Sequence, residues 1–81
     1  MVDRVTRLFA DVLGVDEKSL SDASSPDNVP KWDSLAAMHL VAEIEEAFNI
    51  ELSTREIMKM QTIGIVKSVL IEKGITVQDL K

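Results

Sequence analysis

Ser34 is the residue whose type and setting most clearly suggest chemistry. It lies in the run PKWDSL (residues 30–35), where a polar stretch gives way to a strongly amphipathic segment. At the start of a helix, a serine presents its hydroxyl at the positive end of the helix dipole, where an attached phosphate would be stabilised. The residues alone leave a second interpretation open, in which Ser34 is an ordinary first-turn serine.

The other reactive residues do not form a catalytic set with Ser34. The single histidine, His39, lies five positions further on, and residues five apart on a helix are rotated by about 140°, so they do not face each other. One histidine with scattered carboxylates makes a poor metal site. The glycines are isolated, so the chain has no glycine-rich phosphate loop. We therefore expect a protein that is not an enzyme and holds no metal.

Length and composition bound the remaining possibilities. The chain has 81 residues, which suits one small domain spanning residues 1–81. It has no cysteine, which fits a reducing compartment, and we expect the cytoplasm. No apolar run is long enough to span a membrane, and the first residues do not resemble a secretory signal.

The negative charge is concentrated in one part of the chain. The formal net charge is −5, and residues 33–56, with six acidic residues and one basic residue, account for all of it. An acidic stripe argues against nucleic acid as a partner and favours a basic protein surface. The alternative interpretation is a merely solvated helix face.

Apolar spacing predicts an all-α fold, a four-helix bundle with a short third helix and a long ordered loop between helices one and two. The first helix uses apolar residues from Val2 to Leu13 and ends at Gly14. The loop covers residues 15–33. The second helix begins at about Ser34, with Asp33 as its N-cap, and ends near Asn49.

The second half of the chain carries its own helix signals. Residues 53–56 (STRE) match a capping box that opens the short third helix. Thr62 can cap the fourth helix, which ends at Gly74, and residues 75–81 are expected to fray. We expect the bundle to be a monomer.

The second helix divides into an inward and an outward face. The inward stripe consists of Leu40, Val41, Ile44, Ala47 and Phe48. Three apolar residues to one side of it are expected to be partly exposed: Leu35, Met38 and Ala42. The acidic residues expected on the outer surface are Glu43, Glu45 and Glu46.

Asp33-Ser34-Leu35 and the helix behind it resemble the acyl carrier protein family. Similar features are the Leu13-Gly14-Val15 end of the first helix, the exit from the second helix at residues 48–52, the short third helix and the apolar fourth. The resemblance covers nearly the whole chain. It implies that Ser34 receives 4′-phosphopantetheine from coenzyme A through a separate phosphopantetheinyl transferase, and that the arm's thiol then holds an acyl group as a thioester.

The resemblance also implies partners, namely enzymes with basic patches that load or transfer acyl groups in fatty acid, polyketide or related specialised biosynthesis. The implied recognition residues are Asp33, Leu35, Met38, His39, Ala42, Glu43, Glu45 and Glu46. Ala36 and His39 stand where carriers of bacterial fatty acid synthesis usually have acidic residues, and Trp32 also differs from that type. These departures favour a specialised carrier.

Two questions stay open at this level. An acyl chain could enter the bundle past Ile57, Met58 and Met60, because methionine adapts to irregular apolar volumes, but we favour plain core positions for these residues. Trp32 is expected to pack the loop onto the bundle. The alternative to a carrier is an unmodified helical interaction module that binds a partner through Leu35, Met38 and Ala42.

Overall fold

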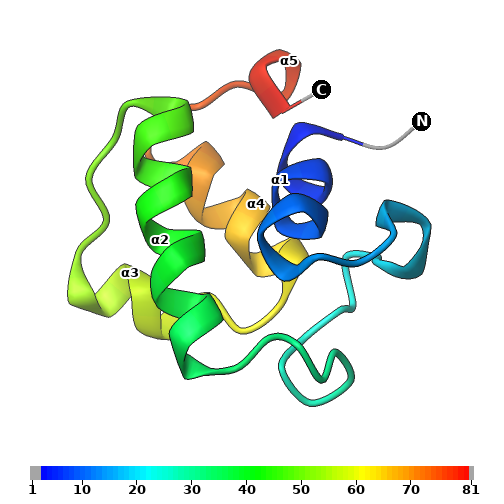
Figure 1. The fold of residues 1–81 in the computed structure, drawn as a ribbon. Helices are drawn as coiled ribbons and strands as arrows, with labels where there is room; N and C mark the ends of the chain where they lie inside the picture. Colours follow the sequence, from blue (N-terminus) through cyan, green and yellow to red (C-terminus); the bar gives the residue numbers. More distant parts are fainter. Residues whose placement is uncertain (1–2, 81) are drawn as a thin grey trace.

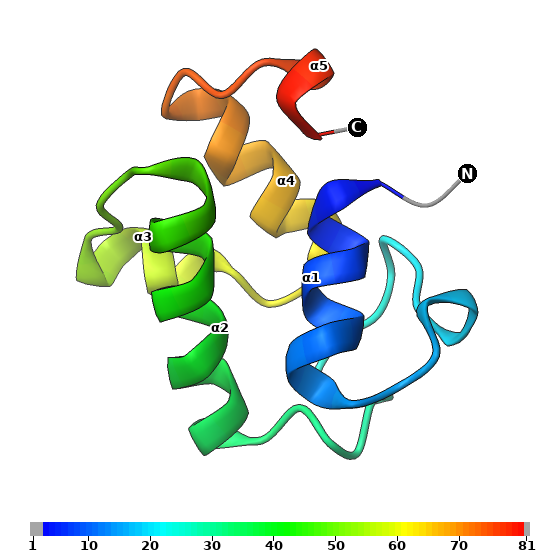
Figure 2. The same ribbon diagram turned by 45° about the horizontal axis from the view of Figure 1, so that its top comes forward.

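The computed structural model describes residues 3–80, which form an all-α fold without strands. The elements in chain order are α1 (Arg4–Leu13), the 3-10 helix η1 (Glu17–Ser19), α2 (Ser34–Phe48), α3 (Thr54–Lys59), α4 (Ile63–Glu72) and α5 (Val77–Leu80). α1 contacts α2, α4 and α5, and α3 contacts α4 (Figure 1). The start of α1 lies beside α5, so the two ends of the described chain are close together (Figures 1 and 2).

Several helix ends lie where the sequence predicts them, because each of these is set by a local cap. The Asp33 carboxylate accepts the backbone N–H of Ala36 at the start of α2, and Thr62 caps α4 in the same way. Ser53 and Glu56 form the predicted capping box of α3. Gly14 and Asn49 end α1 and α2 in the left-handed conformation, at φ 68° and 53°.

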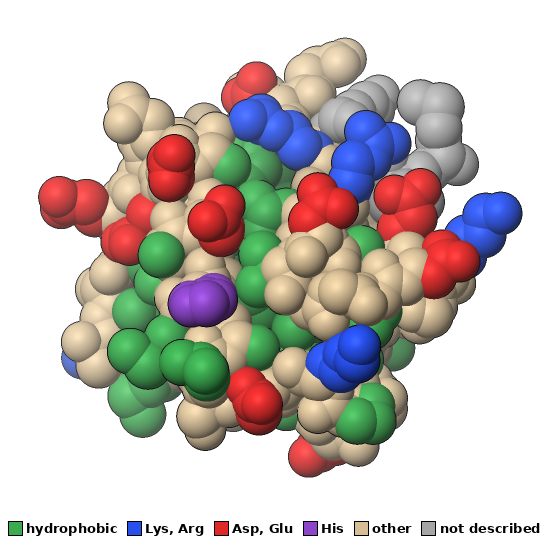
Figure 3. Space-filling model, viewed as in Figure 1, with side chains coloured by type: hydrophobic (Ala, Val, Ile, Leu, Met, Phe, Trp, Pro, Cys, Tyr) green, Lys and Arg blue, Asp and Glu red, His purple; other side chains and the backbone are tan. Residues whose placement is uncertain are grey.

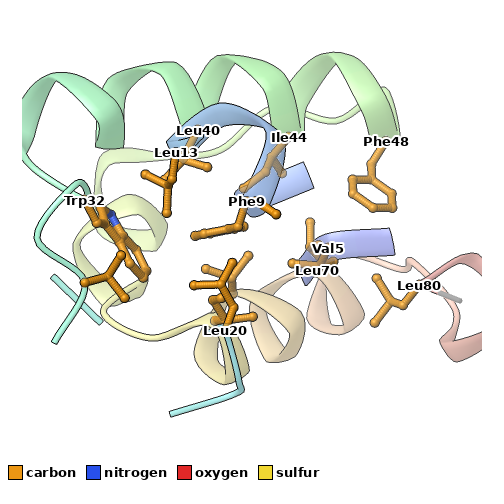
Figure 4. Packing of buried hydrophobic residues seen from close by; sticks show 14 residues of the cluster. Val5, Phe9, Leu13, Leu20, Trp32, Leu40, Ile44, Phe48, Leu70 and Leu80 are labelled. Atoms are coloured by element: carbon orange, nitrogen blue, oxygen red, sulfur yellow. The ribbon is translucent and has the colours of Figure 1, made fainter. Parts of the chain in front are cut away.

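Phe9 of α1 lies at the centre of one apolar core (Figure 4). The largest fully buried side chains come from α1, α2 and α4: Phe9, Ile44, Ile63, Leu70, Val5 and Val66. From α2 only Leu40, Ile44 and Phe48 are buried, at the four-residue spacing of a single helical stripe. Burial along this stripe holds α2 against α1.

The long loop between α1 and α2 is ordered by three apolar anchors. Leu20, Val29 and Trp32 are all buried in the same core. The Trp32 ring meets the Phe9 ring edge-on, with centroids 5.0 Å apart and an interplanar angle of 70°. The expected packing role of Trp32 is therefore confirmed.

Close backbone contact joins this loop to the start of α4. The amide of Gly64 donates to the Asp22 carbonyl at 2.9 Å, and the amide of Ile63 donates to the Ser24 carbonyl at 3.1 Å. A Cβ atom on residue 64 would lie 3.1 Å from that Asp22 oxygen, which is tighter than ordinary packing. Lys67 reinforces the joint through ion pairs with Asp22 and with Asp3, the N-cap of α1.

These ion pairs shift the pKa values of Lys67 and Asp3. Burial lowers the pKa of Lys67, but its hydrogen bonds to Asp22 and Asp3 outweigh burial and hold the pKa above its ordinary value. Burial likewise raises the pKa of Asp3, and hydrogen bonds from Lys67 and Thr6 bring it below its ordinary value. Lys67 and Asp3 are therefore both charged at neutral pH.

The structure differs from the expected bundle at its C-terminal end. Residues 75–80 do not fray: α5 forms there, and Leu80 is buried in the core. The carbonyl of Asp79 also accepts a hydrogen bond from Arg4 of α1 at 3.4 Å. Two parts of the prediction, the start of the first helix at Val2 and fraying at Lys81, lie outside the described residues.

Candidate functional site

Ser34 is the first residue of α2, and it is exposed. Asp33 takes up two of the amides of the first turn: its carboxylate accepts that of Ala36 and its carbonyl that of Ala37, both at 2.9 Å. The first N–H groups of any helix have no acceptor within the helix, so those of Ser34 and Leu35 remain available. A negative group on the Ser34 hydroxyl would therefore meet the positive end of a 15-residue helix.

The surface beside Ser34 is hollowed. A hollow of about 260 Å³ is lined by Pro26, Trp32, Asp33, Ser34 and Ala37. A second hollow, of about 430 Å³, shares Pro26, Trp32 and Ala37 with the first and continues to Ile57, Met58 and Met60. A flexible arm attached at Ser34 would have room to lie along this path toward α3.

Two further spaces lie along α2. An open groove of about 290 Å³ is lined by Ala37, Met38, Val41 and Ile57. A smaller cavity of about 40 Å³ reaches inward, between Phe9, Trp32, Leu40 and Val66. Ala37 lines all four spaces, although the sequence prediction did not name it. Its position three residues after Ser34, on the same helix face, was the available signal.

The residues expected at the entrance to the core are more exposed than predicted. Ile57 and Met58 are 38% and 70% exposed, and Met60 is half-buried against the core. α3 contributes no buried residue at all. The favoured interpretation of these residues as plain core positions is therefore wrong for Ile57 and Met58.

Most of the expected recognition residues share the exposed surface of α2. Leu35 and Met38 are the most exposed large apolar side chains of this helix, at 66% and 70%. The other exposed members are His39, Ala42, Glu43 and Glu46. Figure 3 shows the histidine, in purple, among hydrophobic side chains with acidic groups nearby. The structure thus brings an apolar ridge and acidic groups together.

Asp33 and Glu45 differ from the rest of that set because each also has a structural partner. The side chain of Asp33 caps α2. Glu45 was expected on the outer surface, but it is half-buried, and its carboxylate accepts the backbone N–H of Leu52 at 2.9 Å. This bond ties the segment after α2 back onto the helix, a contact between residues seven apart that helix periodicity does not reveal.

α3 is held to α4 by an ion pair. The ammonium group of Lys73 lies 3.0 and 3.2 Å from the two carboxylate oxygens of Glu56. The hydrogen bond from the backbone N–H of Ser53, followed by that from Lys73, lowers the pKa of Glu56 to about 2. The position of α3 beside the hollows therefore depends partly on charge.

Within residues 3–80, no group of three or more His, Asp or Glu side chains could hold a metal ion. Of the helices from α1 to α5, none has the length and apolar character needed to cross a membrane.

Comparisons with known proteins agree with the fold and with this geometry. A family model described as "Phosphopantetheine attachment site" matches residues 3–66, which include α1, α2 and α3. The structure also matches the solution NMR structure of a holo acyl carrier protein from Nitrosomonas europaea, with a TM-score of 0.73 and 27% sequence identity. That match covers 85% of this chain and 89% of the other.

The family model spans well over half of the chain, and the structural match extends along both chains. The chain therefore belongs to the phosphopantetheine-binding family of acyl carrier proteins, whose members are carriers and not enzymes and bear a covalently attached 4′-phosphopantetheine group.

Proposed function

We propose that Ser34 is the attachment residue and that the protein carries acyl intermediates for fatty acid, polyketide or related specialised biosynthesis. One observation carries the assignment: the exposed hydroxyl of Ser34 lies at the open N-terminus of α2, beside a hollow that adjoins a second one lined by residues of α3. The attached group supplies a thiol that holds the acyl chain as a thioester.

The attachment step needs only the hydroxyl from this chain. A phosphopantetheinyl transferase binds coenzyme A, and the Ser34 oxygen attacks its pyrophosphate. A new bond forms between that oxygen and phosphorus, a pyrophosphate P–O bond breaks, and the nucleotide leaves while the hydroxyl proton passes to the transferase or to solvent. Asp33 keeps the first turn ordered during this step. The resulting phosphodiester is stabilised by the helix dipole.

The exposed face of α2 is proposed as the surface that partner enzymes contact. Leu35, Met38 and Ala42 supply apolar area, while Glu43 and Glu46 supply negative charge beside it. A partner with an apolar pocket and a basic rim would complement this face, and charge pairing would speed association at low salt. Asp33, His39 and Glu45 complete the proposed set. Since His39 is neutral or positive rather than acidic, it favours a specialised partner.

The attachment is tested by intact-mass analysis after incubation with coenzyme A and a transferase of broad specificity. We expect the mass to increase by one phosphopantetheine group in the wild type and not at all in Ser34→Ala. Ser68→Ala is the matched control, because Ser68 is an exposed helix serine on α4. It should gain the group as the wild type does. A modified Ser34→Ala variant, or an unmodified wild type with several transferases, contradicts the proposal.

A second candidate function rests on the exposure of Leu35 and Met38 alone. In that case the chain is an unmodified interaction module, which binds a partner or a second copy through the same face. Sedimentation of the unmodified protein distinguishes the two. A monomer is expected for the carrier, while concentration-dependent association that Met38→Glu abolishes would favour the module.

A further inference from the structure

α3 presents positive charge to solvent, in contrast to the acidic α2. Arg55 and Lys59 are exposed and lie four residues apart, so they share one face of the helix. Neither forms an ion pair with another residue of the described range 3–80. The one acidic residue of α3, Glu56, is bound to Lys73, so its charge is already balanced. The outer face of α3 therefore offers two positive charges to a partner.

Exposed apolar side chains connect the surface of α2 to this basic face. Met38 of α2 and Ile57 of α3 line one open groove. Met58, the next residue of α3, is 70% exposed. Successive helix residues are about 100° apart, so Met58 lies between Ile57 and the basic pair, Arg55 and Lys59, around the axis of α3. A band of apolar side chains therefore runs from Met38 to Met58 and ends at the two positive charges.

The apolar band has acidic residues at its other border. Glu43 and Glu46 are exposed and follow Met38 along α2. Figure 3 shows acidic groups over the upper, C-terminal half of α2 and hydrophobic side chains gathered below them, on the side of α3. Asp27 and Glu51 are exposed as well, but they lie in the segments before α2 and α3. The face as a whole is therefore negative on α2, apolar in the middle and positive on α3.

We propose that this face binds a partner protein of mixed charge, with a basic patch over Glu43 and Glu46 and an acidic patch over Arg55 and Lys59. The inference deepens the partner surface proposed above and rests on the proposed function. Opposite charges on the two sides of an apolar band fix the orientation of a partner, because the reversed orientation brings like charges together. Since the chain has a net charge of −5, nucleic acid or an anionic membrane fits the two basic residues less well than an acidic patch on a protein does.

The test uses two helical peptides of equal length as model partners, each with leucines along one face. The mixed peptide carries lysines at one end and glutamates at the other, and the all-lysine peptide carries lysines at both ends. Calorimetric titration of the full-length protein at low salt gives the two dissociation constants, and ¹⁵N amide shifts locate the contacts. We expect the mixed peptide to shift the amides of residues 42–46 and of residues 55–59. Shifts confined to α2 would refute the role of α3.

Charge reversal on α3 should change which peptide binds better. In Arg55→Glu/Lys59→Glu, the ratio of the two dissociation constants should move by about fivefold in favour of the all-lysine peptide, because attractive contacts with the mixed peptide become repulsive. The matched control is Arg7→Glu/Lys18→Glu, which makes the same change in net charge on α1 and η1, on the far side of α2 from α3 (Figure 1). Its ratio should stay within about twofold of the wild type. Equal movement in both variants would overturn the proposal, because total charge alone would then explain it.

A milder variant decides the proposal if the reversed one does not fold. Arg55→Gln/Lys59→Gln removes the charges and keeps good helix formers, and it should move the ratio in the same direction by about twofold. An unchanged ratio in this variant would refute the proposal. So would tighter binding of the wild type to phosphatidylglycerol vesicles or duplex DNA than to the mixed peptide. Failure of the carrier function is distinguishable, because it appears as the absence of a mass gain at Ser34 and leaves the peptide ratios unaffected.

Discussion

The C-terminal end of α2 is fixed to α1, whereas its N-terminal end stands largely free. Phe48 is buried, the Arg4 guanidinium lies 4.6 Å from the centre of its ring, and the same guanidinium donates to the Ala47 carbonyl at 3.0 Å. At the other end, none of the first six residues of α2 is buried. Leu40 is the first residue of this helix to enter the core.

This difference shows how a small bundle can expose a reactive residue without losing its fold. Helix formation is cooperative, so anchoring one end and the middle of α2 also keeps its free end helical. Apolar burial supplies the anchoring, and the free end needs only a cap. The exposed ridge can then contact partners while the stability of the protein is set elsewhere.

The largest expected effect comes from removing the anchor. Phe48→Ala should lower the free energy of unfolding by about 3–5 kcal/mol, as buried phenylalanine truncations do. This loss is a large share of the free energy of unfolding, which is roughly 4–12 kcal/mol for a chain of this length. Met38→Ala at the free end should change it by about 0.5 kcal/mol or less. Urea denaturation followed by circular dichroism measures the free energy of unfolding of both variants. Equal losses of stability would refute the contrast between the fixed and the free end of α2.

A smaller effect is expected at the contact between α1 and the end of α2. Arg4→Met removes the cation–π contact with Phe48 and the charged hydrogen bond to Ala47, with an expected loss of about 1–2 kcal/mol. Arg7→Met is the control, because the ion pair between Arg7 and Glu17, at 3.6 Å, is exposed and worth about 0.5 kcal/mol or less. Thermal unfolding of the two variants should rank them in this order. The reverse ranking would mean that Arg4 is not an anchor.

At the free end of α2, two substitutions of Asp33 separate its role as the N-cap from the effect of its negative charge. Asp33→Ala should cost about 1 kcal/mol of stability, because the Ala36 amide loses its acceptor, whereas Asp33→Asn keeps an acceptor and should cost little. The rates at which the transferase modifies the two variants then show whether Asp33 acts as a cap or through its charge. If only the cap matters, Asp33→Asn is modified at the wild-type rate, and a slow Asp33→Asn indicates that the transferase reads the charge.

The smallest expected effect is on the pH dependence of stability, and it arises from Glu56 in the first turn of α3. Folding lowers the pKa of Glu56 from 4.5 to about 2, so its ionised form stabilises the folded protein above the unfolded pKa. That contribution is lost as the pH falls from about 5 to about 2. Glu56→Gln should therefore flatten the fall in Tm over this range. Glu72→Gln, at an exposed position on α4, should not, and an identical acid profile for both would contradict the role of Glu56.

The features that the sequence predicted correctly are those decided within a few residues of the chain. Asp33, Asn49 and Thr62 mark helix ends through bonds to neighbours three or four positions away, so local patterns suffice. Leu80 could not be predicted as buried, because its partners belong to helices distant in the sequence. α5 has only four residues, too few to be stable without that packing.

The candidate site shows the same division. The exposed setting of Ser34 followed from the helix start, and its role as the attachment residue stays a prediction until it is tested by mass. The hollows around Ala37 could not be foreseen, because they depend on where the loop residue Pro26 and the α3 residue Ile57 meet α2. The structural role of Glu45 was hidden for the same reason: the path of the chain after Asn49 brings Leu52 back to it.

Two glycines that are alike in the sequence should tolerate different replacements. At Gly14 a Cβ would meet nothing within 4 Å, so only the φ of 68° restricts the residue, and asparagine should be accepted there in a saturation library. At Gly64 any side chain would push against the Asp22 backbone, which must yield by a few tenths of an ångström. Substitutions at position 64 should therefore survive selection only alongside compensating changes in the loop, so the loop and α4 constrain each other's variation.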